Sequence, residues 1–288
     1  IEFILNEDRD MSENRIYFVD VTNRDGVQTS RLGLAKLEKT IINLMLDDMG
    51  ITQSEFGFPT TQHELNYLNG NLELVRRGAI KKTKLSGWMR GIASDVESSF
   101  KNVPELKYVN LSQSTSEQMI TGKYQGKKTP DDIIKMTKEA VECAIDKGAK
   151  IIGVNAEDAS RSDIDFLIKY ALEAKKSGAH RFRYCDTLGF EDPKTTYDRI
   201  YKIAKATNMP IEMHFHNDLG MATACSVMGA RAAIDAGVDA YINTAINGMG
   251  ERAGNADLVS CLLACLKSAG FKGKYKIDEN IKLDRAWH

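Results

Sequence analysis

Residues 130–187 read PDDIIKMTKEAVECAIDKGAKIIGVNAEDASRSDIDFLIKYALEAKKSGAHRFRYCDT, and this stretch repeats one pattern twice. In each copy an amphipathic run ends near a glycine, Gly148 or Gly178, and a short apolar run follows. The apolar spacing predicts helices over 130–147 and 162–177, and the short runs predict strands over 151–155 and 181–187. A glycine after each helix is typical of the position where a helix ends.

The same alternation continues outward in both directions along the chain. Further strands are expected at 16–22, 51–57, 83–91, 106–114, 211–217 and 240–246, with helices at 34–49 and 193–207 among others. Gly50 and Gly237 fall at expected helix ends, and Pro130 and Pro193 fit the first turn of a helix. Alternating strands and helices indicate a parallel sheet, and about eight repeats indicate closure into a (β/α)8 TIM barrel.

An open doubly wound sheet is the competing architecture, but no GxGxxG follows the first strand. We therefore assign residues 1–271 to one TIM-barrel catalytic domain. Residues 272–288 fall outside the eight repeats, and we interpret them as the start of a C-terminal extension or a tail. A chain of 288 residues with 42% hydrophobic content suits a single domain of this kind.

Composition excludes several classes of function. Lys and Arg (39) nearly balance Asp and Glu (40), and no basic face is evident, which argues against a nucleic-acid partner. No apolar run approaches the roughly 18 residues that suggest a membrane span. Residues 1–14 are acidic and polar, unlike a secretory signal. Five cysteines with no CxxC pair predict buried thiols in a reducing cytoplasm.

Polar residues follow every expected strand, where a TIM barrel carries its active site. Any one of them has a simple interpretation as a turn or cap residue, but their occurrence at all eight strands indicates a site. In chain order they include Arg24, Asp25, Glu55, Arg90, Ser112, Ser114, Asn155, Glu157, Asp186, Thr187, His214, His216, Asn243 and Asn247.

The most specific local signal is His214-Phe215-His216. Residues two apart on a strand point to the same face, so both imidazoles can converge on one ion. A carboxylate from another strand end would complete a set of two histidines and one carboxylate with open positions for a substrate. Asp25 is the best candidate, since Arg24 beside it adds a positive charge. A pair of core or surface histidines is the alternative interpretation.

Three separated motifs carry a resemblance to a known family: Asn23-Arg24-Asp25-Gly26-Val27-Gln28, His214-Phe215-His216-Asn217-Asp218 and residues 247–255, NGMGERAGN. They resemble the metal-dependent acyl-CoA condensing enzymes, namely the isopropylmalate, homocitrate, citramalate and Re-citrate synthases, which are related to the hydroxymethylglutaryl-CoA lyases. The resemblance covers about residues 16–271. The chain looks most like a Re-citrate or homocitrate synthase.

The resemblance implies a site around one divalent ion. Asp25, His214 and His216 would be metal ligands, with Asn255 as the fourth and Asn247 as a fallback. The ion would be Mn2+, Mg2+, Co2+ or Zn2+. Arg24 would donate to the ketone oxygen of a 2-oxo acid, and Glu157 would assist enolisation of acetyl-CoA. The resemblance also places Glu55, Arg90 and Thr187 around the substrate, and the polar run at the end of the fourth strand adds Ser114 to the pocket; for Glu251-Arg252 we favour an ion pair that shapes its loop.

The sequence departs from the family motif at Asn23, where a leucine is usual, and at Val27, where an acid is usual. The synthases also carry a catalytic His and Tyr after the barrel, whereas this sequence stops at His288. We expect those residues to come from C-terminal sequence that is missing here or disordered. The resemblance further implies a homodimer.

Three classes of activity compete: an acetyl-CoA:2-oxo acid synthase, a lyase that runs the reverse cleavage, and a metal-free binding module. The resemblance implies that lyases use a cysteine in the loop after strand 8, but residues 247–255 contain none, while Cys261 and Cys265 follow on a helix. This favours the synthase. The polar residues near Glu55, His63 and Ser114 favour a dicarboxylic 2-oxo acid, oxaloacetate or 2-oxoglutarate, although His63 fits a surface position equally well.

Overall fold

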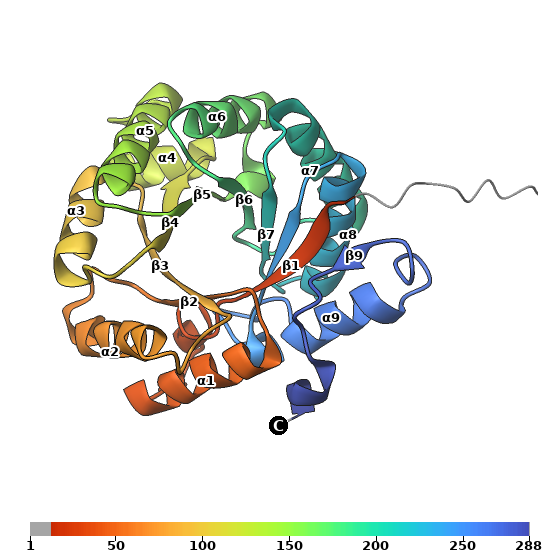
Figure 1. Cartoon of the computed structure of the whole chain (residues 1–288). Coiled ribbons are helices and arrows are strands. Elements are labelled where there is room, and N and C mark those ends of the chain that lie inside the picture. Colours follow the sequence, from red (N-terminus) through yellow and green to blue (C-terminus); the bar gives the residue numbers. More distant parts are fainter. Residues whose placement is uncertain (1–12, 288) are drawn as a thin grey trace, which may run out of the picture.

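The protein is described by a computed structural model that covers residues 13–287. The expectation for the first 14 residues therefore lies almost wholly outside the described part. Eight parallel strands surround a centre and helices surround the strands, in a closed ring that is seen end-on in Figure 1. The strands are β1 (Arg15–Asp20), β2 (Gln53–Gly57), β3 (Lys84–Arg90), β4 (Tyr108–Ser114), β5 (Ile151–Glu157), β6 (Arg181–Asp186), β7 (Ile211–Phe215) and β8 (Ala240–Thr244). The helices are α1 (Lys36–Met49), α2 (Leu65–Arg76), α3 (Ala93–Asn102), α4 (Glu117–Tyr124), α5 (Pro130–Asp146), α6 (Ile164–Lys176), α7 (Pro193–Thr207), α8 (Ala222–Asp235) and α9 (Leu258–Lys267).

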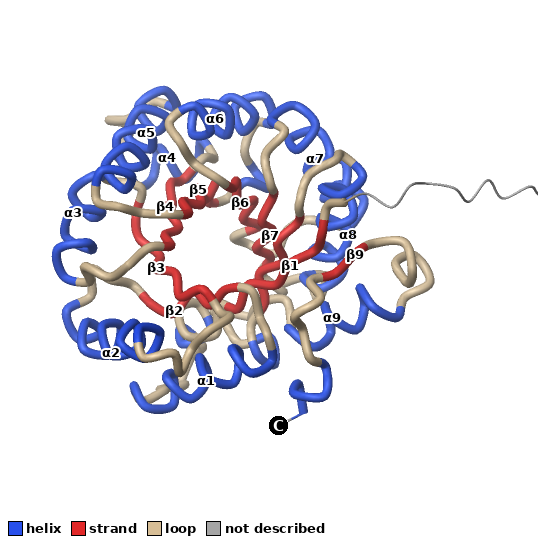
Figure 2. Tube along the Cα trace, in the orientation of Figure 1, coloured by secondary structure: helices blue, strands red, loops and turns tan. Residues whose placement is uncertain are grey.

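The sheet closes between the first strand and the last of the eight. β1 pairs with β8 from Ile16 to Asp20 and with β2 at Val19 and Asp20, all in parallel. The alternation of strand and helix continues without interruption around the ring (Figure 2). The predicted (β/α)8 TIM barrel is confirmed, and each of the eight expected strands is present with ends shifted by a few residues.

The sequence signals at helix ends have the expected conformations. Pro130 and Pro193 are the first residues of α5 and α7. Gly50, Gly148, Gly178 and Gly237 follow α1, α5, α6 and α8, and all four have positive φ. α6 begins two residues later than expected because the side chain of Asp163 accepts a hydrogen bond from the Phe166 N–H and caps the helix there.

Residues 272–287 run back along the barrel. Within them β9 (Lys276–Ile277) pairs in parallel with β1 at Arg15 and Ile16. β2 joins β1 only further along, at Val19, so β9 lies beside the first part of β1. Gly50 allows the close approach: a Cβ there would lie 2.0 Å from the backbone oxygen of Asn280. This short strand has no counterpart in the expected elements, since two residues carry no periodic signal.

The apolar core lies mainly between the strands and the ring of helices. The interior of the barrel differs, because it contains the buried charged side chains of Glu55, Arg181, Arg183 and Glu212. TIM barrels usually fill this space with branched apolar side chains. Charged groups thus extend from the C-terminal ends of the strands into the centre of the barrel. Among the described helices, none has the length and apolar character that crossing a membrane requires.

Candidate metal centre

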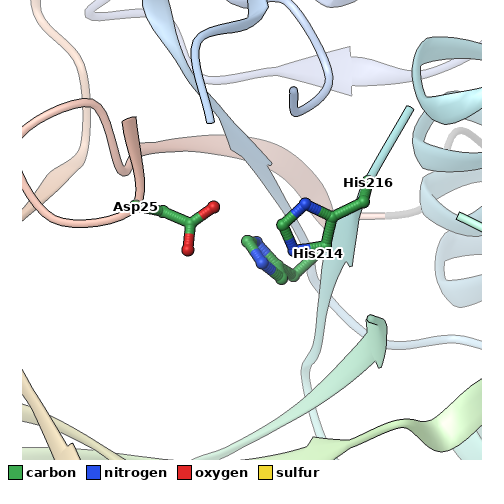
Figure 3. A group of neighbouring side chains, drawn as sticks. All are labelled: Asp25, His214 and His216. Carbon is green, nitrogen blue, oxygen red and sulfur yellow. The ribbon is translucent and has the colours of Figure 1, made fainter. Parts of the chain in front are cut away.

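Asp25, His214 and His216 form a buried cluster at the C-terminal ends of β1 and β7. One ligand atom of each residue lies within 4.8 Å of the others. The two imidazoles are nearly perpendicular, with ring centroids 4.9 Å apart, and the Asp25 carboxylate faces both (Figure 3). The structure therefore brings together residues that are about 190 positions apart in the sequence.

Local backbone geometry explains how each side chain reaches the cluster. After β1 the chain turns tightly, since the N–H groups of Arg24, Asp25 and Gly26 all donate to the Val21 carbonyl. This turn points Asp25 across the barrel mouth. On β7, Phe215 lies between the two histidines in the sequence, and its ring stacks on that of Tyr184 with the ring centroids 6.0 Å apart. Phe215 is buried there, so the imidazoles share the opposite face, as strand alternation requires.

Asn255 joins the cluster from the loop after β8. Its amide Nδ2 donates to Asp25 Oδ2 at 2.7 Å and to the Met249 carbonyl at 2.8 Å, which leaves Oδ1 as the free acceptor. Gly250 permits this packing, because a Cβ there would lie 2.2 Å from Asn255 Nδ2. The fallback ligand Asn247 is exposed in the preceding turn, Ile246–Gly248.

The donor atoms fit a cation. His216 Nδ1 and Asn255 Oδ1 are buried with no hydrogen-bond partner. Burial lowers the pKa of His214 to about 3, which keeps its imidazole neutral. Burial alone would raise the pKa of Asp25, but the adjacent Arg24 guanidinium lowers it, and the pKa lies below its usual range. A carboxylate, two neutral imidazoles and an amide oxygen are the forms that bind divalent metals.

Arg24 lies beside the cluster and is fixed on two sides. Its Nη1 pairs with Asp25 Oδ1, and its Nε donates to Glu55 Oε1 at 2.6 Å. The guanidinium also lies over the Trp88 ring, 5.4 Å from its centroid. Glu55 is completely buried, and its other oxygen accepts from Asn110 and Arg183. Glu55 thus contacts Arg24 with one oxygen and the barrel interior with the other.

Three further candidates form a second group at the ends of β4, β5 and β6. The Ser114 hydroxyl donates to Glu157 Oε2 at 2.8 Å, and Lys123 Nζ contacts the same oxygen at 2.5 Å. The Thr187 hydroxyl accepts from the N–H of Asp158, the residue that follows Glu157. These side chains line one side of the barrel mouth.

Arg90 and His63 lie apart from both groups. Arg90 makes two hydrogen bonds to Asp95, and its side chain is 63% exposed. His63 is exposed in a short 3-10 turn, Gln62–Glu64, before α2. Arg252 also acts locally: it pairs with Asp218 and donates to the Thr187 carbonyl, which ties the loop after β8 to the loops after β6 and β7. The Glu251–Arg252 pair is present at 3.3 Å.

The sequence alone did not point to Asn110, Arg183, Glu212 or Trp88, which surround Glu55 and Arg24 in the structure. For two of these residues the sequence did contain a signal. Arg183 and Glu212 are charged residues flanked by apolar neighbours on their strands, and such residues face either solvent or a paired partner. Which partner they meet depends on strand order and register, which a single sequence does not give.

Comparison with known proteins identifies the family of this chain. The model of the HMGL-like family matches residues 15–287. The chain belongs to the HMGL-like family. It is 57% identical over 273 residues to citrate (Re)-synthase of Dehalococcoides mccartyi, covering 95% of this chain and 66% of that protein. It is 39% identical over 270 residues to 2-isopropylmalate synthase 2 of Caldanaerobacter subterraneus, covering 94% of this chain and 65% of that one.

These HMGL-like relatives are longer than the present sequence, which spans just under two thirds of their length. A solved structure supports the fold. The HMG-CoA lyase from Brucella melitensis superposes with a TM-score of 0.72 at 17% identity, covering 95% of each chain. The predicted membership among the acyl-CoA condensing enzymes and their lyase relatives is confirmed.

Proposed function

We propose that this protein condenses acetyl-CoA with oxaloacetate held on a divalent metal ion and hydrolyses the thioester, yielding citrate and free CoA. The observation that carries the proposal is the buried cluster of Asp25, His214 and His216 at the mouth of a barrel that is 57% identical to a citrate (Re)-synthase. The enzyme would be an acyltransferase that converts the acyl group to an alkyl group on transfer.

The cluster supplies three protein ligands, and Asn255 Oδ1 would be the fourth, leaving positions for the 2-oxo acid. Mixed nitrogen and oxygen donors suit Mn2+, Mg2+, Co2+ or Zn2+. A bound ion would polarise the ketone of the substrate as a Lewis acid, an effect worth several kcal/mol.

The chain's own groups would stabilise the charge and move the proton. Arg24, held by Glu55, would donate to the ketone oxygen where negative charge develops as the new carbon–carbon bond forms. Glu157 would accept a proton from the acetyl methyl group, with Ser114 and Lys123 holding its carboxylate in place. Thr187, whose hydroxyl oxygen accepts from Asp158, would donate its proton to a substrate carboxylate, and Ser114 would do so on releasing Glu157. The predicted roles of Arg90 and His63 in substrate binding would require both side chains to turn inward.

Oxaloacetate is favoured over the other 2-oxo acids by two observations. Identity is 57% to the citrate (Re)-synthase, compared with 39% to the isopropylmalate synthase. The mouth of the barrel is also lined by hydroxyl and cationic side chains, including Ser114, Lys123 and Thr187, which suit a second carboxylate better than a branched alkyl chain.

A lyase function is disfavoured by the cysteines. Cys261 and Cys265 lie on α9, where both are buried. Burial raises the pKa of the Cys265 thiol to about 12 and that of Cys261 further, so neither is a ready proton donor or nucleophile. The loop that contributes Asn255 contains no cysteine.

The test combines metal analysis with a substrate screen. Protein purified with and without a chelating wash is assayed for bound metal and for thiol release from acetyl-CoA. The 2-oxo acids are oxaloacetate, 2-oxoglutarate, 2-oxoisovalerate and pyruvate. We expect metal-dependent release that is fastest with oxaloacetate, with citrate as the product. Preference for 2-oxoisovalerate would contradict the substrate proposal, and full turnover without metal would contradict the mechanism.

We further propose a homodimer, as family membership suggests, with α1 as the contact. Leu37, Ile41, Leu44 and Met45 are exposed on α1 at helical spacing, between 36% and 69%. The exposed stripe runs between Lys36 and Asp48, so two antiparallel copies would bring opposite charges together. Light scattering of the wild type and of Ile41→Glu tests this: a dimer that the substitution dissociates supports it, and a monomeric wild type refutes it.

A cytoplasmic location is also proposed. All five cysteines are free thiols and four of them are buried, which suits a reducing compartment. Fractionation of the source cells with an antibody against the protein would test the location.

A further inference from the structure

Four charged side chains occupy the interior of the barrel beneath the candidate metal centre. Arg181 and Arg183 come from β6, Glu55 from β2 and Glu212 from β7, and each side chain is at most 5% exposed. Glu212 pairs in register with Arg183, two residues before His214 on the same strand. The network therefore lies one layer below the metal ligands.

Arg183 connects this network to the site. Its Nη2 lies 2.7 Å from Glu55 Oε2 and 2.6 Å from Glu212 Oε1, and its Nε donates to Glu212 Oε1 at 2.9 Å. Glu55 Oε1 then accepts from Arg24 Nε at 2.6 Å. A continuous chain of contacts thus runs from Glu212 through Arg183 and Glu55 to Arg24.

The arrangement fixes the direction of the Arg24 guanidinium. A buried carboxylate without partners is expensive, so Glu55 stays ionised only because cations surround it. Burial raises the pKa of Glu55, but Arg183 and then Arg24 outweigh this and lower it to about 2. With Glu55 held by Arg183 and Asn110, one edge of the Arg24 guanidinium is bound and the other edge faces Asp25.

We propose that Arg183 is a positioning residue which, acting through Glu55, holds the Arg24 guanidinium beside the metal ligands in the orientation that stabilises the developing oxyanion. The inference rests on the proposed function for its kinetic consequence, but the geometric claim stands apart from the reaction. Arg181 provides the contrast, because its contacts are with Gln53, Glu212 and the Tyr241 ring, whereas Arg183 is the arginine of β6 that pairs with Glu55.

Trp88 offers a readout of Arg24. The chain has two tryptophans, so Trp287→Phe leaves Trp88 as the single fluorophore, 5.4 Å from the Arg24 guanidinium. In this background Arg183→Met/Glu212→Gln is compared with Arg181→Met/Glu212→Gln. Each double variant removes one buried arginine and the same glutamate, so net charge is matched. Arg24→Met gives the emission of Trp88 without the cation. Asn155→Ala in the same background measures the separate contribution of the Asn155 amide, whose oxygen lies 3.2 Å from Trp88 Nε1 and 3.3 Å from Arg183 Nη1.

We expect the Arg183 double variant to shift Trp88 emission toward that of Arg24→Met. Its kcat should fall on the order of 100-fold, the effect of losing one oxyanion donor, with oxaloacetate KM and Mn2+ affinity changed less than about threefold. The Arg181 double variant should keep the parental emission and a kcat within about threefold. Equal losses in both variants, or parental emission in the Arg183 variant, would overturn the proposal.

Circular dichroism checks that each variant folds. Should the Arg183 double variant not fold, Arg183→Lys replaces it, since one ammonium reaches Glu55 or Glu212 but cannot span both as the guanidinium does. It should give a partial emission shift and a partial loss of kcat, and unchanged values of both would refute the role. Because the fluorescence needs no turnover, a parent protein without citrate-forming activity would refute the proposed function while leaving the positioning claim open to the same test.

Discussion

Asp25 and Asp47 are both buried aspartates, yet their surroundings differ completely. Asp47 lies on α1, and its Oδ1 accepts from the N–H groups of Lys81, Lys82 and Thr83 at 3.0, 2.6 and 2.8 Å. Asp25 lies at the opposite ends of the strands beside two imidazoles and an amide, two atoms of which lack partners. Burial of a carboxylate therefore does not by itself mark a site. What distinguishes Asp25 is that His216 Nδ1 and Asn255 Oδ1, both buried without a hydrogen-bond partner, belong to the residues around it.

His216→Ala should produce the largest effect, because it removes a proposed metal ligand while leaving the barrel core intact. We expect bound Mn2+ to fall strongly and citrate formation to fall on the order of 1000-fold, since the ion contributes several kcal/mol. Metal analysis and thiol release measure the two effects. His180→Ala is the control, since His180 accepts a hydrogen bond from Ile152 at the start of β5, far along the strands from the cluster. Full metal content and turnover in His216→Ala would reject the assignment.

The sequence predicted one half of this comparison better than the other. The eight strands were predictable because each is a short apolar run between helices, and Asp25 and His214-Phe215-His216 were predictable because strand ends converge in a barrel. Asp47 was not singled out, since its partners are backbone groups about 35 positions away and any helix can carry an aspartate. The contact between Arg183 and Glu55, 128 positions apart, was not predictable either, because it depends on strand order and register.

Asp47→Ala tests the structural aspartate. It leaves three N–H groups without their acceptor, and hydrogen bonds to a charged group are worth about 1.5–3 kcal/mol each. Water can reach part of this turn, so we expect a loss of about 4 kcal/mol in the free energy of unfolding. Mn2+ affinity of the folded protein should stay within about threefold, since Asp47 is remote from the cluster. Urea denaturation and metal titration measure the two quantities, and a selective loss of metal affinity would contradict the division of roles.

Asp20 is a third buried aspartate, and it differs from Asp25 in the direction of its pKa shift. Burial raises its pKa to about 7, against the two hydrogen bonds that it accepts from Thr22. The unfolded group ionises near pH 4, so between these values the folded state retains a proton that the unfolded state has lost, and stability falls as pH rises. Asn does not titrate. The free energy of unfolding of Asp20→Asn, relative to that of the wild type, should therefore rise by about 2 kcal/mol between pH 5 and pH 6.5. Urea denaturation at each pH measures this difference. A difference that is independent of pH would show that Asp20 is ionised when folded.

Gly250→Ala should give the smallest effect and probes how tightly the Asp25 side of the comparison is built. The new Cβ would lie 2.2 Å from Asn255 Nδ2, so the amide must move away from Asp25 Oδ2 and from the Met249 carbonyl. Disturbing a group that orients a metal ligand weakens binding by about 10-fold at the lower end of the usual range, and we expect a tenfold rise in the Mn2+ dissociation constant. Gly70→Ala on α2 is the matched control, since a Cβ there meets no atom within 4 Å. Equal Mn2+ affinity in both variants would mean that the orientation of Asn255 is not needed for the cation, and the ligand set would reduce to Asp25 and the two histidines.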